Sequence, residues 1–295
     1  MSGLTVAIDV GGTKLVGALL DAGGIRHRVE RPTPGPPGAA DPGSSGLRRL
    51  AADLAALAGG WVRADQPGVD VTAVGLGCCE YVHGGRLTST EVLAWTEQPA
   101  DWLPTVFPRA TVVVESDVRC GLVAERRLGA ARDVDSVVFV SWGTGLSSAV
   151  LVDGRIWPGT RGRAIALGEL PGPLGLNLEG FVSGAGMAAR WGSATGQTGR
   201  DARALLAAAD SSEPTAQAIA ATAGQALAEA LSGVVHLLDP ARIVLGGGLG
   251  CADTVARRAL TRHWSRLGSP AELVMAELGP DGPLLGAGLV AGWRG

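Results

Sequence analysis

The stretch Asp9-Val10-Gly11-Gly12-Thr13-Lys14 decides the fold. It follows an apolar, β-branched run at residues 4–8 and precedes a second strand-like run at residues 15–20. The glycines between them therefore predict a hairpin loop. Two familiar phosphate-binding motifs are excluded, because the sequences GxxxxGK[ST] and GxGxxG each lead into a helix.

The same design occurs again near the middle of the chain. A strand is predicted at residues 137–140, followed by the loop Gly143-Thr144-Gly145 and a strand at residues 146–152. Aligning Gly12 with Gly143 also matches Thr13 with Thr144. Two hairpins of one design, each beginning a half of the chain, predict a duplicated α/β fold with a cleft between its halves.

The remaining pattern alternates between short strands and helices, as a mixed α/β protein requires. Further strands are predicted at residues 25–30, 69–77, 111–115, 243–245 and 272–275, and helices at 47–62, from 116 or 117 to 129, and at 185–191, 201–209, 213–238, 254–267 and 284–293. Residues 31–45 are rich in Pro, Gly and Ser and predict a loop. We expect a small domain at 1–116, completed by 283–295, and a large domain at 117–282.

Composition excludes several classes of function. The 295 residues carry a net charge of −3 with no basic stripe, which argues against a nucleic-acid partner. The sequence shows no signal-peptide pattern and no apolar run of membrane-spanning length, so we expect a cytoplasmic protein without a membrane partner. The four cysteines and four histidines match neither a zinc pattern nor a disulfide framework.

Three glycine-rich stretches at strand ends carry the main functional signal. They lie at residues 11–12, 143–145 and 246–248. Polyphosphates need backbone N–H groups that can approach closely, which a side chain would prevent. One such stretch is more often a tight turn, whereas three in series indicate phosphate binding. Lys14 is the only lysine among 25 basic residues, and a compact ammonium inside the first loop suits a phosphate.

Two aspartates lie where they could serve phosphoryl transfer. Asp9 ends the first strand, where it is either a turn residue or a carboxylate that orients a hydrated Mg²⁺. Asp117 lies between a strand and a helix, where it is either a helix cap or a general base that accepts the proton of a sugar hydroxyl. The residues alone leave both pairs of alternatives open.

In order and along the whole chain, these motifs resemble the ROK family of bacterial sugar kinases. The motifs are Asp9 to Lys14, Glu115-Ser116-Asp117, Gly143-Thr144-Gly145, Gly168-Glu169, Leu178-Glu179 and Gly246-Gly247-Gly248. The resemblance implies the actin-like ATPase fold, which is related to ribonuclease H. It also implies ATP-dependent phosphorylation of a sugar hydroxyl, usually the primary hydroxyl at C6, and homodimers are common in the family.

The resemblance also assigns roles to individual positions. It implies that Asp117 is the catalytic base and that Asp9 holds Mg²⁺ through water. Glu169 and Glu179 would bind sugar hydroxyls. The phosphates of ATP would be held by Gly11, Gly12, Thr13, Lys14, Gly143, Thr144 and Gly145, and the adenosine pocket would be lined by Gly246, Gly247 and Gly248.

The chain departs from the family pattern on the sugar side. Ser116 stands where the family has Asn, Gly172 stands where it has His, and Glu91 replaces another Asn. The family's zinc-binding loop corresponds to Pro173–Glu179, which contains no cysteine, so we expect no zinc. The family's Pro-Gly turn is replaced by Cys79-Glu80.

These departures favour an amino sugar as substrate. Glu91, together with Glu80, would make the sugar side more acidic, and carboxylates bind an ammonium through strong charge-assisted hydrogen bonds. We expect Glu91 and Ser116 to contact the sugar, with kanosamine (3-amino-3-deoxyglucose) as the leading candidate, because kinases for kanosamine occur in this family in antibiotic biosynthesis. A C7-cyclitol and glucose are the rivals, and Glu91 as a solvated loop residue is the alternative interpretation.

A function of another class is a sugar sensor without catalysis. ROK repressors carry an N-terminal helix-turn-helix, for which we expect no room before Gly11. A sensor would not be expected to keep Asp117, so the sequence favours the kinase.

Overall fold

The computed structural model describes residues 3–22, 24–34, 44–64, 70–196 and 198–292. Most of the loop predicted at residues 31–45 lies outside these ranges. The chain divides into two units, each with its own contacts. The first unit contains residues 1–127, 158–164 and 281–295, and the second contains residues 128–157 and 165–280.

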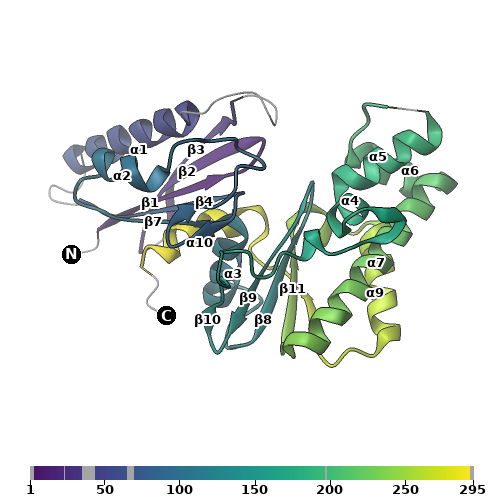
Figure 1. Ribbon diagram of the computed structural model, residues 1–295. Coiled ribbons are helices and arrows are strands. Elements are labelled where there is room, and N and C mark those ends of the chain that lie inside the picture. The colour runs from purple at the N-terminus through teal and green to yellow at the C-terminus, as the bar shows by residue number, and fades with distance from the viewer. Residues whose placement is uncertain (1–2, 23, 35–43, 65–69, 197, 293–295) are drawn as a thin grey trace. The chain divides into compact units, whose positions relative to one another are not determined.

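A five-stranded sheet forms the first unit (Figure 1). The strands are β1 (Leu4–Val10), β2 (Lys14–Asp21), β3 (Gly24–Pro32), β4 (Val71–Cys78) and β7 (Thr111–Ser116), in the spatial order β3-β2-β1-β4-β7. β1 pairs with β2 in antiparallel fashion, which confirms the predicted hairpin. β1 also pairs with β4, and β4 with β7, both in parallel.

The sheet of the second unit repeats this arrangement. Its strands are β8 (Val137–Trp142), β9 (Leu146–Val152), β10 (Arg155–Ile156), β11 (Arg242–Gly246) and β12 (Glu272–Met275), in the order β10-β9-β8-β11-β12. β8 is antiparallel to β9 and parallel to β11, and β11 is parallel to β12. Strand for strand, order and direction match the first sheet, which confirms the predicted duplication.

The two hairpin loops are not identical. Val10 pairs with Leu15, whereas Trp142 pairs with Leu146, so the second loop is one residue shorter than the first. The first loop is closed by a hydrogen bond from the Gly11 N–H to the Lys14 carbonyl, at 2.9 Å. When Gly12 is aligned with Gly143, the second strands of the two hairpins therefore match, but the first strands are out of register by one residue.

Helices cover both faces of the first sheet. They are α1 (Ser45–Ala64), α2 (Pro99–Val106), α3 (Asp117–Leu128) and α10 (Gly282–Val290), with a small hairpin of β5 (Val82–His83) and β6 (Arg86–Leu87). Side chains alternate along β1, so Val6 and Ile8 join the core beneath α1. Ala7 lies on the opposite face in a cluster with Cys120 of α3 and Ala287 of α10. Helix α2 begins at Pro99, contains Pro104 and was not predicted.

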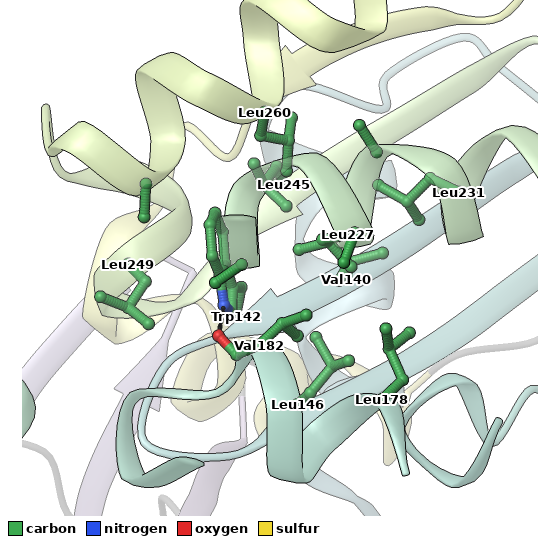
Figure 2. Close-up of a cluster of buried hydrophobic side chains, with 14 of the residues drawn as sticks. Val140, Trp142, Leu146, Leu178, Val182, Leu227, Leu231, Leu245, Leu249 and Leu260 are labelled. Atoms are coloured by element: carbon green, nitrogen blue, oxygen red, sulfur yellow. Dashed lines mark hydrogen bonds between the residues drawn. The ribbon is translucent and has the colours of Figure 1, made fainter. Parts of the chain in front are cut away.

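Helices and short segments of the second unit pack mainly against the face of its sheet that carries Val138, Val140 and Trp142. They are η1 (Leu167–Glu169), η2 (Pro173–Gly175), α4 (Leu178–Val182), α5 (Gly184–Thr195), α6 (Ala202–Asp210), α7 (Pro214–Leu238), α8 (Gly247–Cys251) and α9 (Val255–Leu267), and the 3₁₀ turn η3 (Gly279–Asp281) precedes α10. Figure 2 shows their core, in which Trp142 is fully buried and its indole N–H donates to the Val182 carbonyl at 2.8 Å. Helix α7 has the length and composition of a membrane span, but half of its apolar window is buried, as in the core helix of a globular unit.

The division into units bears on the predicted domain boundary. We expected the small domain to end at residue 116, whereas the contacts group α3 through Arg127 with the first unit. The reason is packing, because Cys120 of α3 lies against α10 beside the first sheet. The segment 158–164 also belongs to the first unit, which the sequence did not indicate.

The interface of α7 and α9 generates a stability prediction. A Cβ at Gly224 would lie 2.1 Å from the Ala256 carbonyl oxygen, whereas a Cβ at Gly233 of the same helix would meet nothing within 4 Å. We expect Gly224→Ala to lower the free energy of unfolding by about 1–3 kcal/mol through overpacking. Gly233→Ala should raise it by up to about 1 kcal/mol through helix propensity. Urea unfolding of both variants measures this, and equal effects would contradict the packing.

Candidate active site

The carboxyl ends of three parallel strands meet at one edge of the first sheet. Asp9 of β1 pairs with Gly77 of β4, and Gly77 pairs with Glu115 of β7. The register therefore brings Asp9 to the level at which β7 passes into α3, whose first residue is Asp117. Ligands of α/β sheets commonly bind at this edge. Asp9 also alternates with Ile8 and Val10, so it shares the face of Ala7, which α3 and α10 cover.

Both aspartates have a raised pKa. Burial raises the pKa of Asp9 to about 6, and the charge of Lys14 opposes this rise. The pKa of Asp117 is raised to about 7, first by burial and then by the negative charges of Asp9 and, to a smaller extent, Glu80. The Val118 N–H donates to Asp117 Oδ1 at 2.6 Å and opposes the rise. Two coupled carboxyl groups of this kind are typical of a site that binds a cation or moves a proton.

Ser116 precedes the aspartate at the end of β7. Its side chain is buried, and its hydroxyl has no hydrogen-bond partner among the described residues. A buried hydroxyl without a partner is costly, so its place beside Asp117 suits a site that a polar ligand completes. Its contact with a sugar stays a prediction.

The first glycine loop is held by the segment after β3. The Thr33 hydroxyl donates to the Gly11 carbonyl at 2.7 Å, and the Thr33 N–H donates to the Thr13 carbonyl. Lys14 lies 3.6 Å from the Glu30 carboxylate, and both side chains are nearly half exposed. Such an exposed ion pair is weak, so the ammonium can move to a phosphate at low cost.

In the second unit, the other two glycine stretches lie together. A Cβ at Gly143 would be 3.7 Å from the Gly248 nitrogen, and a Cβ at Gly247 would be 2.4 Å from the Trp142 carbonyl oxygen. The prediction of a loop at 246–248 was wrong in one respect, because Gly246 ends β11 and Gly247 opens α8 directly. Gly247 allows this turn since its φ is +78°, a left-handed value that glycine adopts freely.

Backbone contacts fix the second hairpin loop. The Gly184 and Ala185 N–H groups at the start of α5 donate to the carbonyls of Gly143 and Thr144, at 2.8 and 3.1 Å. The Gly143 N–H closes the loop onto the Gly145 carbonyl. A pocket of about 570 Å³ adjoins Thr144 and is lined mainly by α5 and residues 198–202, a volume that suits a small ligand.

The two predicted sugar ligands of the second unit differ in their surroundings. Glu179, in the first turn of α4, accepts the Leu146 N–H at 3.1 Å and lies against Gly145 and Gly168. A Cβ at Gly168 would lie 2.8 Å from the Leu146 carbonyl oxygen and would also press against Glu179. The absence of a side chain at Gly168 therefore leaves room for Glu179. Glu169 ends η1 with an exposed side chain.

The segment that corresponds to the family's zinc loop is closed by backbone hydrogen bonds. The Gly172 N–H donates to the Leu176 carbonyl at 2.8 Å, and the Leu178 N–H donates to the Leu170 carbonyl at 2.7 Å. The segment 170–178 is therefore a short hairpin-like turn with Leu174 exposed at its tip.

Glu80 does not have the surroundings of a sugar ligand. Its carboxylate is buried and accepts the N–H groups of Val92 and Leu93, each at 2.7 Å. Glu91, in contrast, is exposed, with its carboxylate 3.9 Å from Arg163, whose guanidinium stacks on the Tyr81 ring. The expectation that Glu80 adds acidity for the substrate is therefore wrong, because backbone donors occupy it.

A buried arginine that the sequence did not single out holds this region together. Arg119 of α3 is only 3% exposed. It donates to Glu115 at 2.7 Å and to the Val82 and Gly162 carbonyls at 2.9 and 2.6 Å. It thereby ties the segment 158–164 to the helix that begins at Asp117. Glu115 is four residues away, but Val82 and Gly162 are distant in sequence, so only the place of Arg119 on the buried side of α3 could have indicated it.

Comparison with known proteins places nearly the whole chain within one family. The sequence profile of the ROK family matches residues 5–292. The chain is 32% identical over 297 residues to the bifunctional enzyme NanE/NanK of Brucella suis, which covers 95% of this chain and 52% of that protein. The chain thus spans about half the length of that curated relative. It is 30% identical to N-acetylmannosamine kinase of Escherichia fergusonii, over 97% of this chain and 98% of that protein.

Solved structures agree as well. The ROK hexokinase of Thermus thermophilus superposes with a TM-score of 0.78 at 29% identity, over 99% of this chain and 98% of that chain. The duplicated sheets and this match establish the actin-like ATPase fold that the sequence predicted. With the matching profile spanning almost the whole chain, the protein belongs to the ROK family.

Proposed function

We propose that this protein is an ATP-dependent sugar kinase that transfers the γ-phosphoryl group to the primary hydroxyl at C6 of a hexose. The observation that carries the proposal is the pair of partly buried carboxyl groups with raised pKa, Asp9 and Asp117, at the carboxyl edge of the first sheet. Relatives named as kinases of hexoses and of N-acetylmannosamine support the reaction class.

The residues present fit ATP and Mg²⁺. Asp9 offers one carboxylate, and Mg²⁺ is usually held by few carboxylates and several waters. Gly12 and Thr13 offer backbone N–H groups in a loop without bulky side chains, Gly11 closes that loop through its own N–H, and Lys14 adds a weakly held ammonium. In the second unit, Gly143, Thr144 and Gly145 would bind phosphates, and Gly246, Gly247 and Gly248 would line the adenosine pocket. When bound, ATP would supply the phosphoryl group, and Mg²⁺ would neutralise part of its negative charge.

Asp117 is the proposed catalytic base. Its pKa of about 7 lets it be deprotonated near neutral pH and still accept a proton from the sugar hydroxyl. The Val118 N–H holds Oδ1 of this carboxylate, and the sugar hydroxyl would donate to Oδ2. Phosphoryl transfer asks little more of the protein than positioning and charge stabilisation. Glu169, Glu179 and Ser116 would orient the sugar.

For the substrate, we propose an amino sugar, with kanosamine as the leading candidate and a role in antibiotic biosynthesis. Glu91 supports this, because among the described residues its exposed carboxylate pairs with Arg163 at a distance of 3.9 Å, and a substrate ammonium could replace this cation. C7-cyclitols and glucose remain the alternatives, and a sugar sensor without catalysis is the alternative of another class.

We propose that this kinase acts in the cytoplasm and that it has no nucleic-acid or membrane partner. We propose that it needs no structural zinc, because backbone hydrogen bonds close the segment 170–178 and no cysteine lies there. We also propose that the protein forms homodimers, which are common in this family.

The raised pKa of Asp117 predicts a pH-dependent gain in stability for Asp117→Asn. A carboxyl whose pKa is higher in the folded state binds more protons there, so its cost grows as pH rises from about 4 through 7. The variant should therefore be more stable than the wild type at pH 8, and the difference should shrink toward pH 4. Asp101→Asn is the control of opposite sign, since its hydrogen bond with Arg86 lowers the pKa of Asp101. Thermal unfolding at several pH values measures both.

Turnover should depend on the same carboxyl group. Asp117→Asn should lower kcat by about 10²–10⁴-fold, the usual contribution of a general base, while the Kd for the sugar stays nearly unchanged. In the wild type, kcat/KM should fall as pH drops below about 7, because the base becomes protonated. A coupled assay of ADP release gives both values. Normal turnover of the variant would refute the assignment of the base.

Substrate choice can be tested with the Glu91 and Arg163 pair. ADP release should be fastest with kanosamine among glucose, mannose, glucosamine, N-acetylmannosamine, kanosamine and cyclitols. Glu91→Gln should reduce the preference for the amino sugar over glucose by about three- to tenfold, because an exposed charge-assisted hydrogen bond is lost. Arg163→Gln is the matched variant and should increase that preference. Equal or better rates with glucose than with every amino sugar would eliminate the amino-sugar proposal.

A further inference from the structure

The carboxylate of Glu80 is occupied on both oxygens. Oε1 accepts the N–H groups of Val92 and Leu93, and Oε2 accepts the Glu91 N–H at 3.0 Å together with the Ser89 hydroxyl. The Ser89 hydroxyl in turn accepts the Tyr81 N–H at 2.9 Å. Glu80 is 5% exposed, so this carboxylate works inside the protein and not on a ligand.

This arrangement offsets the cost of burying a charge. A buried carboxylate is unfavourable unless donors satisfy it, and here four donors from residues 89–93 do so. Three successive backbone N–H groups can point at one carboxylate only when the segment keeps one conformation. Glu80 thus fixes a loop that has no other regular structure.

The loop 89–93 lies between two parts of the proposed site within the first unit. A Cβ at Gly12 would be 3.1 Å from the Val92 side chain, so Val92 borders the first glycine loop. Glu91 presents its carboxylate toward Arg163 at 3.9 Å. Leu93 is buried in the core beneath the sheet and anchors the far end. Any change in the conformation of the loop therefore moves Glu91 relative to Gly12.

We propose that Glu80 is a positioning residue for the sugar acceptor, holding the loop 89–93 so that Glu91 faces the substrate beside the first glycine loop. The proposal rests on the kinase function proposed above. Glu80 acts through the loop and does not touch the substrate. Its charge also contributes to the raised pKa of Asp117, so it links the acceptor loop to the base electrostatically.

The test combines a readout of the loop with a readout of the reaction in the full-length protein. Glu80→Gln keeps the size of the side chain but replaces one acceptor oxygen by a donor, so at least one N–H of the loop loses its partner. Hydrogen–deuterium exchange at residues 91–93 should accelerate by about tenfold or more. The KM for the sugar should rise by about tenfold, because a displaced contact group weakens positioning, while the KM for ATP changes by less than about twofold. The acid limb of kcat/KM should move to lower pH.

Glu97→Gln is the matched control, because Glu97 is a carboxylate of the same unit that binds the side chain of Arg48. It should leave exchange at 91–93, both KM values and the acid limb unchanged. If Glu80→Gln does not fold, Ser89→Ala removes one donor from Glu80. We expect it to change the exchange rate and the sugar KM in the same direction, each by about threefold.

The outcomes separate the two proposals. A wild type that phosphorylates no sugar would refute the kinase function, while the exchange measurement would still test the role of Glu80. An active wild type, with exchange, sugar KM and pH profile unaltered in Glu80→Gln, would overturn the inference and leave the kinase function intact. Equal increases in both KM values would also overturn it, since they would indicate a general structural defect.

Discussion

The parallel pairing of β1, β4 and β7 is the constraint on which the first unit depends. Because β1 and β4 are in register from Thr5 onward, Asp9 lies beside Gly77, and β7 brings Glu115 next to the same glycine. A Cβ at Gly77 would lie 3.1 Å from the Cys120 sulfur and 3.4 Å from the Asp117 Cα, so this glycine lets α3 pack closely on the sheet. The closeness of the two aspartates is thus a consequence of backbone register and of one missing side chain.

The glycines divide by the physical reason for each. A Cβ at Gly75 would clash with the Ala287 carbonyl of α10, and a Cβ at Gly224 of α7 would clash with the backbone of α9. These glycines permit close packing of helices on sheets and on one another. Gly247 instead permits a left-handed turn from β11 into α8. A high glycine content therefore supports a densely packed fold with open strand ends, and it is not a sign of disorder.

Much of the fold could be predicted from the sequence, because its signals are local. The first hairpin, the helical period at Leu47 and Leu50, and the strand-to-helix junction at Asp117 each depend on neighbouring residues. The network around Glu80 and Arg119 could not be predicted, because it joins residues that are distant in the chain. Gly246 could be placed at a strand end, but the start of α8 at Gly247 could not be predicted, since glycine disfavours helices.

Four carboxyl groups gather near the carboxyl edge of the first sheet, and the fold treats them in two ways. Glu115 is paired with the buried guanidinium of Arg119, and Glu80 is surrounded by backbone N–H groups and the Ser89 hydroxyl. Within the described part of the chain, Asp9 and Asp117 have fewer donors than Glu80, and burial raises the pKa of each. A carboxyl group that the protein leaves incompletely compensated is most stabilised by an arriving cation or proton. The same packing that fixes the surrounding loops thus reserves two carboxyl groups for chemistry.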